Sequence, residues 1–123
     1  MIKGTGVDIV EIERVKKAAC RESFRSRVYT PLEIEYCEAK GKQKYASYAA
    51  RFAAKEAFLK ALGTGLREGS LQDIEVYNDE LGCPHLRVRG FWAEKIAELG
   101  TEKIFLSLSH GQEYAVAQCI LEG

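Results

Sequence analysis

Two carboxylates stand where the hydrophobic pattern calls for apolar side chains. Asp8 lies inside Val7-Asp8-Ile9-Val10, a run that is otherwise β-branched and apolar. Glu56 falls within the apolar stripe of a helical segment, about 40° from Phe52 on a helical wheel. Burying a carboxylate is costly unless it is paired, hydrogen-bonded or bound to a metal. These two residues are therefore the first candidates for chemistry.

The pair suits a Mg²⁺ site, because Mg²⁺ is typically held by one or two carboxylates while phosphate oxygens and water complete its shell. Lys60 follows Glu56 by one helical turn and would contact a phosphate beside the metal. Two simpler interpretations stay open. Asp8 could make a strand-end turn or pair with a lysine, and Glu56 with Lys60 could form an ordinary i,i+4 ion pair, worth about 0.2–0.5 kcal/mol.

A strongly basic segment runs from Arg14 to Arg27, with six basic residues against the single acid Glu22. Its composition predicts one helix from Glu11 to about Arg27, on which four basic residues line one face: Arg14, Lys17, Arg21 and Arg25. Phe24 adjoins this face and would serve as an apolar anchor. The face is either a solvated surface or a docking surface for an acidic partner.

The composition narrows the class of protein. A length of 123 residues fits one domain, residues 1–123, and 46% hydrophobic with 29% charged residues excludes a disordered chain. Because 18 Lys+Arg balance 18 Asp+Glu, binding of nucleic acid through overall charge is not expected. No apolar run is long enough for a membrane span. The four scattered cysteines, with no C-x-x-C pair and no histidine at metal-ligand spacing, indicate free thiols in the cytoplasm, with Cys37 and Cys119 as core residues.

The elements that must position these residues follow from caps and periodicity. Thr30, Pro31 and Glu33 form a capping-box signature, and Gly63 is a natural helix stop. The chain is expected to run as strand 2–12, the basic helix, helix 31–39, long helix 43–62, strands 71–77 and 84–88 around a turn at 78–82, helix 91–99, and strands 103–109 and 113–121. This order predicts an α+β fold, with an antiparallel sheet packed against a long central helix and shorter helices.

Several motifs resemble a known family. They are G-x-G-V-D-I-V-E-I-x-R-V at 4–15, T-P-x-E at 30–33, R-F-A-A-K-E-A-F-x-K-A-L-G-T-G at 51–65, and the stretch 107–115. Together, and collinearly over nearly the whole chain, they resemble holo-acyl-carrier-protein synthase, the short bacterial type of 4′-phosphopantetheinyl transferase. The long motif at 51–65 is far more specific than a lone glycine pattern.

The resemblance implies Mg²⁺-dependent transfer of 4′-phosphopantetheine from coenzyme A to a serine of an apo acyl carrier protein. Adenosine 3′,5′-bisphosphate would be released, and the reaction would serve fatty acid biosynthesis, a part of lipid metabolism. By motif, Asp8 and Glu56 would be metal ligands and Lys60 would contact the phosphates of coenzyme A. The other residues expected to line the coenzyme A site are Arg51, Gly63, Gly65, Ser109 and His110.

The resemblance also implies a homotrimer with the active site between subunits, and a basic helix that docks the acidic carrier protein. Three acceptors for the serine proton stay open: a metal-bound water, Glu56 or Asp8. The alternative function is a non-catalytic module whose basic helix binds an acidic protein or RNA. In that case Asp8 and Glu56 would only form structural pairs, and no magnesium dependence is expected.

Overall fold

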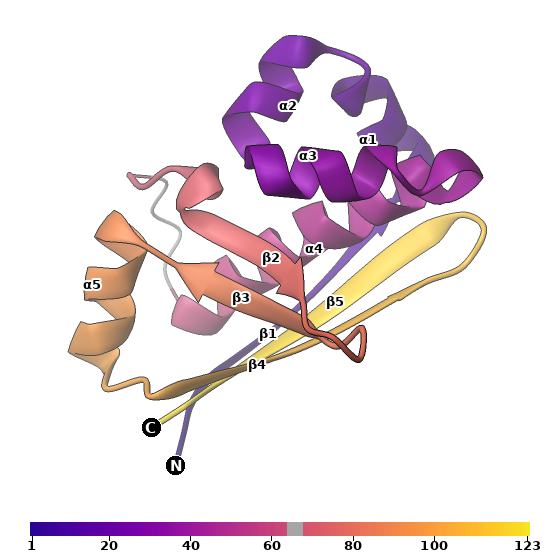
Figure 1. Cartoon of the computed structure of the whole chain (residues 1–123). Coiled ribbons are helices and arrows are strands. Elements are labelled where there is room, and N and C mark those ends of the chain that lie inside the picture. Colours follow the sequence, from indigo (N-terminus) through magenta and orange to yellow (C-terminus); the bar gives the residue numbers. More distant parts are fainter. Residues whose placement is uncertain (64–67) are drawn as a thin grey trace.

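The computed structural model describes residues 1–63 and 68–123, and Figure 1 shows an α+β fold with two antiparallel sheets, which confirms the predicted fold class. The helices and strands, in chain order, are β1 (Ile2–Glu11), α1 (Ile12–Ala19), α2 (Glu22–Val28), α3 (Pro31–Glu38), α4 (Lys44–Leu62), β2 (Ile74–Asn78), β3 (Pro84–Val88), α5 (Gly90–Leu99), β4 (Lys103–His110) and β5 (Tyr114–Glu122). Two short 3-10 turns, η1 (Gly41–Gln43) and η2 (Leu71–Asp73), precede α4 and β2.

The larger sheet has the strand order β1-β5-β4, and all of its pairings are antiparallel. The predicted hairpin of the last two strands is confirmed, and β5 is the central strand. The two chain ends lie side by side at one end of the strands of this sheet, as Figure 1 shows. There the Gly123 amide donates to the carbonyl of Met1 at 2.9 Å.

The central helix α4 packs against the sheet at unusually close range. A Cβ atom on Gly6 would lie 2.0 Å from the carbonyl oxygen of Ala57, and one on Gly4 would lie 2.0 Å from that of Ala61. The space that these glycines leave on the face of β1 that carries Asp8 is therefore filled by the backbone of α4. This contact sets the position of Asp8 relative to the helix.

The end of α4 is the predicted one. Gly63 takes a φ of 73°, in the left-handed region that glycine adopts without strain, and its amide donates to the Lys60 carbonyl at 2.9 Å. At 19 residues α4 is the longest helix in the described part of the chain. None of the described helices combines the length and the apolar character that crossing a membrane requires.

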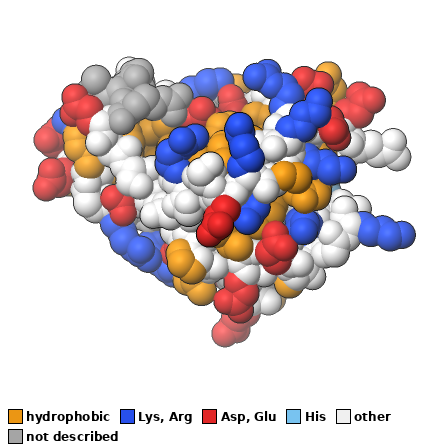
Figure 2. Space-filling view, turned by 90° about the horizontal axis from the view of Figure 1, so that it is seen from above, with side chains coloured by type: hydrophobic (Ala, Val, Ile, Leu, Met, Phe, Trp, Pro, Cys, Tyr) orange, Lys and Arg blue, Asp and Glu red, His pale blue; other side chains and the backbone are white. Residues whose placement is uncertain are grey.

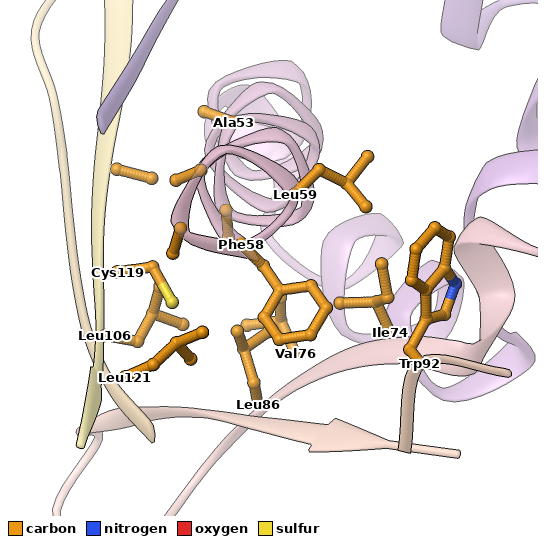
Figure 3. Close-up of a cluster of buried hydrophobic side chains, with 14 residues drawn as sticks. Ala53, Phe58, Leu59, Ile74, Val76, Leu86, Trp92, Leu106, Cys119 and Leu121 are labelled. Carbon is orange, nitrogen blue, oxygen red and sulfur yellow. The ribbon is translucent and has the colours of Figure 1, made fainter. Parts of the chain in front are cut away.

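The main core lies between the three-stranded sheet, α4 and the β2–β3 hairpin (Figure 3). Phe58 extends from α4 toward Val76 and Leu86 of the hairpin. Trp92 of α5 packs edge-on against Phe58, with ring centroids 6.5 Å apart. Cys119 of β5 is fully buried in this core, as predicted, so α4 is enclosed on its sheet side and its hairpin side.

The basic segment is not one helix, and that prediction is wrong. α1 ends at Ala19, Arg21 is extended (φ −91°, ψ 127°), and α2 begins at Glu22. In a continuous helix, Phe24 would point about 180° away from Val15, because the two are nine residues apart. The break lets both side chains pack in the same core, where Val15 is buried and the rings of Phe24 and Phe52 lie 6.0 Å apart.

The start of α3 ties three elements together. The predicted capping box of Thr30 and Glu33 is present. The Glu33 carboxylate also accepts from the Val76 amide at 2.8 Å and from Lys55 Nζ at 2.7 Å. Both side chains of the Glu33–Lys55 pair are fully buried. Desolvation lowers the pKa of Lys55, and the neighbouring carboxylate of Glu33 offsets part of that effect.

The second sheet is the predicted hairpin of β2 and β3, paired from Ile74↔Val88 to Asn78↔Pro84. The strand begins later than predicted, because residues 71–73 form η2. The Ser70 side chain accepts from the Gln72 amide at 3.2 Å, and such a local cap favours a turn over a strand.

Candidate active site

Asp8 and Glu56 line one pocket between β1, α1 and α4. Its volume is about 430 Å³, and Glu11, Arg14 and Tyr114 line it as well. The Asp8 side chain is 14% exposed and Glu56 is half-buried, so both are accessible to a small ligand. The structure thus brings the two predicted carboxylates to one pocket. It adds Glu11 and Tyr114, to which the sequence pattern assigned no role.

Lys60 stands beside Asp8. Its Nζ lies 2.9 Å from Asp8 Oδ1 and donates to the carbonyl of Val7 at 3.0 Å. Asp8 therefore has the lysine partner that the simpler interpretation of the sequence allowed. Because the Lys60 side chain is 57% exposed, the pair contributes at most about 1 kcal/mol to stability. The main effect of the pair is to keep the Lys60 ammonium group next to the Asp8 carboxylate.

The donors of this pocket fit a hard divalent cation. Asp8 and Glu56 offer carboxylate oxygens, the ligand type that Mg²⁺ takes in proteins. Asp8 and Glu56 come from a strand and a helix whose backbones are in direct contact, so their relative position is set by rigid elements. These two residues would hold the ion.

Arg51, Ser109 and His110 line a second pocket of about 380 Å³, next to the β2–β3 turn. Arg51 is only 3% exposed, and its Nη2 donates to Asn78 Oδ1 at 2.6 Å. Its guanidinium carbon lies 3.8 Å from the centre of the Tyr36 ring. Its buried Nε has no hydrogen-bond partner among the described residues. A fixed guanidinium with an unsatisfied donor suits an anion such as a phosphate.

The two pockets have no lining residue in common among the described residues. Within one chain, the predicted metal ligands and three of the predicted coenzyme A contacts therefore lie in separate pockets. Gly63 caps α4, which is the structural role that the glycine pattern suggested. Gly65 lies outside the described residues.

The five residues predicted to bind a partner have different surroundings. Arg14 and Phe24 line the first pocket, while Lys17 and Arg21 are exposed. Arg25 Nη1 donates to a main-chain carbonyl at the end of α1 at 2.6 Å, so Arg25 caps a helix. Figure 2 looks down on the layer of α1–α3 and shows Lys and Arg side chains with acidic side chains between them. Because α1 ends at Ala19 and α2 begins at Glu22, the four basic residues do not lie on the face of one helix, as the sequence pattern predicted.

Comparison with known proteins gives the family. A family model described as the 4′-phosphopantetheinyl transferase superfamily matches residues 4–119. The chain belongs to this superfamily. It is 54% identical over 125 residues to the holo-[acyl-carrier-protein] synthase of Geotalea daltonii, with 99% of each chain covered. It is 49% identical over 124 residues to that of Clostridium tetani, with 100% of this chain and 98% of the relative covered.

Solved transferase structures have the same fold. The holo-[acyl-carrier-protein] synthase of Neisseria meningitidis has a TM-score of 0.89 at 35% identity, over 100% of both chains. The enzyme of Bacillus anthracis, in complex with CoA (3′,5′-ADP), has a TM-score of 0.81 at 40% identity, over 98% of this chain and 96% of that one. The enzyme of Helicobacter pylori, in complex with coenzyme A, has a TM-score of 0.81 at 30% identity, over 96% and 99%.

The resemblance identified from the motifs is therefore confirmed. The chain is an enzyme of the holo-[acyl-carrier-protein] synthase family, a 4′-phosphopantetheinyl transferase. This membership rules against the alternative of a non-catalytic binding module.

Proposed function

We propose that this transferase moves the 4′-phosphopantetheine group of coenzyme A onto a serine of an apo acyl carrier protein, with Mg²⁺, and releases adenosine 3′,5′-bisphosphate. The observation that carries the proposal is that Asp8 and Glu56 line one pocket and that Lys60 forms an ion pair with Asp8. The names of the relatives and the coenzyme A in two related structures support the substrates. The product would enter fatty acid biosynthesis.

In this reaction the serine oxygen attacks the phosphorus that bears the pantetheine arm. The bond from that phosphorus to the bridging oxygen breaks, and the bisphosphate leaves with the electron pair. Asp8 and Glu56 would hold Mg²⁺, and the ion would supply positive charge that offsets the negative charge of the phosphates. Lys60, held at 2.9 Å from Asp8, adds positive charge beside the leaving group. The serine proton goes to Asp8, to Glu56 or to water.

The second pocket would hold the rest of coenzyme A. Arg51 is fixed by Asn78 and by the Tyr36 ring, so it can meet a phosphate without losing much conformational freedom. Ser109 and His110 add a hydroxyl and an imidazole at the end of β4. We include Gly63 and Gly65 in the coenzyme A site by their position in the motif.

We propose further that the two pockets meet between subunits of a homotrimer. One face of the three-stranded sheet packs on α4, and the opposite face bears exposed apolar side chains: Val7 is 57% exposed, Ile9 64% and Phe105 48%. By strand alternation and register, all three point to that opposite face. Exposed apolar patches commonly mark protein–protein contacts. Light scattering should give the trimer mass for the wild type and a smaller species for Ile9→Lys, and a fully active wild-type monomer would contradict the proposal.

A cytoplasmic location also belongs to this proposal. The four cysteines are free thiols, with Cys37 and Cys119 buried and Cys20 and Cys83 exposed. Exposed thiols that stay unpaired are typical of a reducing compartment.

The reaction is tested by mixing the protein with an apo acyl carrier protein, coenzyme A and Mg²⁺, and by reading the intact mass of the carrier. One phosphopantetheinyl group should be added, and EDTA should prevent the addition. Asp8→Asn and Glu56→Gln should each lower the rate by at least about 100-fold. Glu35→Gln, at an exposed carboxylate of α3, is the matched control and should keep the wild-type rate. Transfer that survives EDTA and both pocket variants would refute the proposed roles.

Docking of the carrier protein is tested by charge reversal. Arg14 lines the same pocket as Asp8, so an acidic carrier held there would bring its serine to the carboxylates. Arg14→Glu should raise KM for the carrier and change KM for coenzyme A little. Lys95→Glu, on α5 and away from α1 in Figure 1, should leave both constants unchanged. Equal effects of the two variants would argue against a docking role for Arg14.

A further inference from the structure

The tip of the β2–β3 hairpin gathers three side chains that the proposed reaction does not use. The Asp79 amide donates to the Cys83 carbonyl at 2.9 Å, and Tyr77 pairs with His85 in the strand register. Asp79 Oδ2 lies 2.9 Å from His85 Nε2, and the ligand atoms of Asp79, Cys83 and His85 are close to one another, so the three side chains lie on one side of the hairpin. Leu86 points to the other side, into the core.

The three side chains form a compact set of metal-ligand atoms. A carboxylate oxygen of Asp79, the Cys83 sulfur and an imidazole nitrogen of His85 all lie within 4.8 Å of one another. Ligand atoms at 2.0–2.3 Å from a tetrahedral Zn²⁺ stand about 3.3–3.8 Å apart. Small side-chain rotations would therefore close this set around an ion.

The hairpin holds two of these ligands in position. Asp79 Oδ1 accepts from the amides of Leu81 and Cys83, both at 2.9 Å, which leaves Oδ2 directed at His85 Nε2, also at 2.9 Å. The His85 ring stacks on Tyr77, with centroids 5.3 Å apart and planes at 25°. Hydrogen bonds that orient ligating carboxylates and contacts that fix a ligating imidazole are what metal sites need around them.

We propose that Asp79, Cys83 and His85 bind a Zn²⁺-class ion, with a fourth position open to water. The thiolate excludes Mg²⁺, which prefers oxygen ligands, and the mixed sulfur, nitrogen and oxygen donors suit Zn²⁺. The side chains of His85 and Asp79 are 40% and 38% exposed, so an ion reaches them from solvent. The site is separate from the Asp8–Glu56 pocket, and it does not depend on the proposed reaction.

The site adjoins the second pocket, because Asn78, Gly82 and Pro84 of the same turn line that pocket. An ion on the tip would cross-link the two ends of the turn. It would therefore stabilise the wall of the pocket that faces Arg51.

Co²⁺ is the probe, because a Co²⁺–thiolate bond gives a near-ultraviolet charge-transfer band that Zn²⁺ removes on replacement. Metal-free wild-type protein should develop this band on titration, and equimolar Zn²⁺ should abolish it while excess Mg²⁺ leaves it intact. Cys83→Ser should lose the band, and His85→Gln and Asp79→Asn should weaken binding by at least about 10-fold. Cys20→Ser, at the other exposed cysteine, is the matched control and should bind like the wild type.

Circular dichroism of each variant checks that it is folded, which is expected because all the substituted side chains are at least partly exposed. The absence of a thiolate band in the wild type would overturn the proposal. So would a band that survives Cys83→Ser or that Cys20→Ser removes. In those cases the Asp79–His85 contact would be only a hydrogen bond that closes the turn.

Discussion

Gly6→Ala tests whether the close contact of β1 with α4 positions the proposed active site. The added Cβ would lie 2.0 Å from the carbonyl oxygen of Ala57 and 2.7 Å from the amide nitrogen of Ala61. Both obstacles are backbone atoms, which cannot rotate aside as a flexible side chain does. The strand and the helix must therefore move apart.

The size of the effect follows from these distances. Ordinary contact begins near 3.4 Å, so relief of the clash requires a separation of about 1.4 Å. Overpacking of a core typically costs about 1–3 kcal/mol, and a clash between two backbones belongs at the upper end, so we expect a loss of about 3 kcal/mol. Asp8 is two residues away on the same face and would move with the strand. Misplacement of a catalytic group by about 1 Å can lower a rate by about 100-fold.

Urea unfolding followed by circular dichroism measures the loss of stability, and the carrier-protein mass assay measures transfer. The midpoint of unfolding should fall by about 1 M or more. Gly111→Ala is the matched control, because a Cβ there would meet no atom within 4 Å. A Gly6→Ala protein within about 0.5 kcal/mol of the wild type, with full activity, would refute the reasoning.

Three further predictions concern stability. Lys55→Met should cost about 3–5 kcal/mol in urea unfolding, because it leaves the buried Glu33 carboxylate without its cation, and wild-type stability would contradict that role. Arg25→Ala should lower the melting temperature through loss of the 2.6 Å bond to the Ala19 carbonyl, and an unchanged melting temperature would show that this cap is unimportant. Burial raises the pKa of Cys119 from 9.0 to about 12. The unfolded chain therefore loses the Cys119 thiol proton at a lower pH than the folded chain does. The free energy of unfolding keeps its full value below pH 9 and falls as the pH rises toward 12, by up to about 4 kcal/mol. Urea midpoints measured at pH 8 and 10.5 should show the decline, and Cys119→Ala should reduce it.

Local signals in the sequence were enough to locate most elements. The capping box at Thr30 and Glu33 and the left-handed glycines at positions 63 and 100 act within one turn of a helix. They need no distant partner, so the sequence alone predicts where α3, α4 and α5 begin or end. Asp8 and Glu56 could also be identified from the sequence alone, because each carboxylate interrupts the apolar pattern of its own strand or helix.

The break between α1 and α2 could not be read from local signals. It depends on Phe24 reaching Phe52 of α4, a contact between segments far apart in the chain. The helical spacing of Arg14, Lys17, Arg21 and Arg25 favoured one helix, and packing overrode it.

The sequence by itself determined the family, through a long collinear motif, and the candidate residues Asp8, Glu56 and Lys60. Only the tertiary structure decided which side chains lie together. Lys60 forms an ion pair with Asp8, Arg51 lines a different pocket, and Asp79 lies close to Cys83 and His85. The physical reason is that periodicity describes the faces of one element. Which faces come together is decided by the close packing of a strand, a helix and a hairpin around one core.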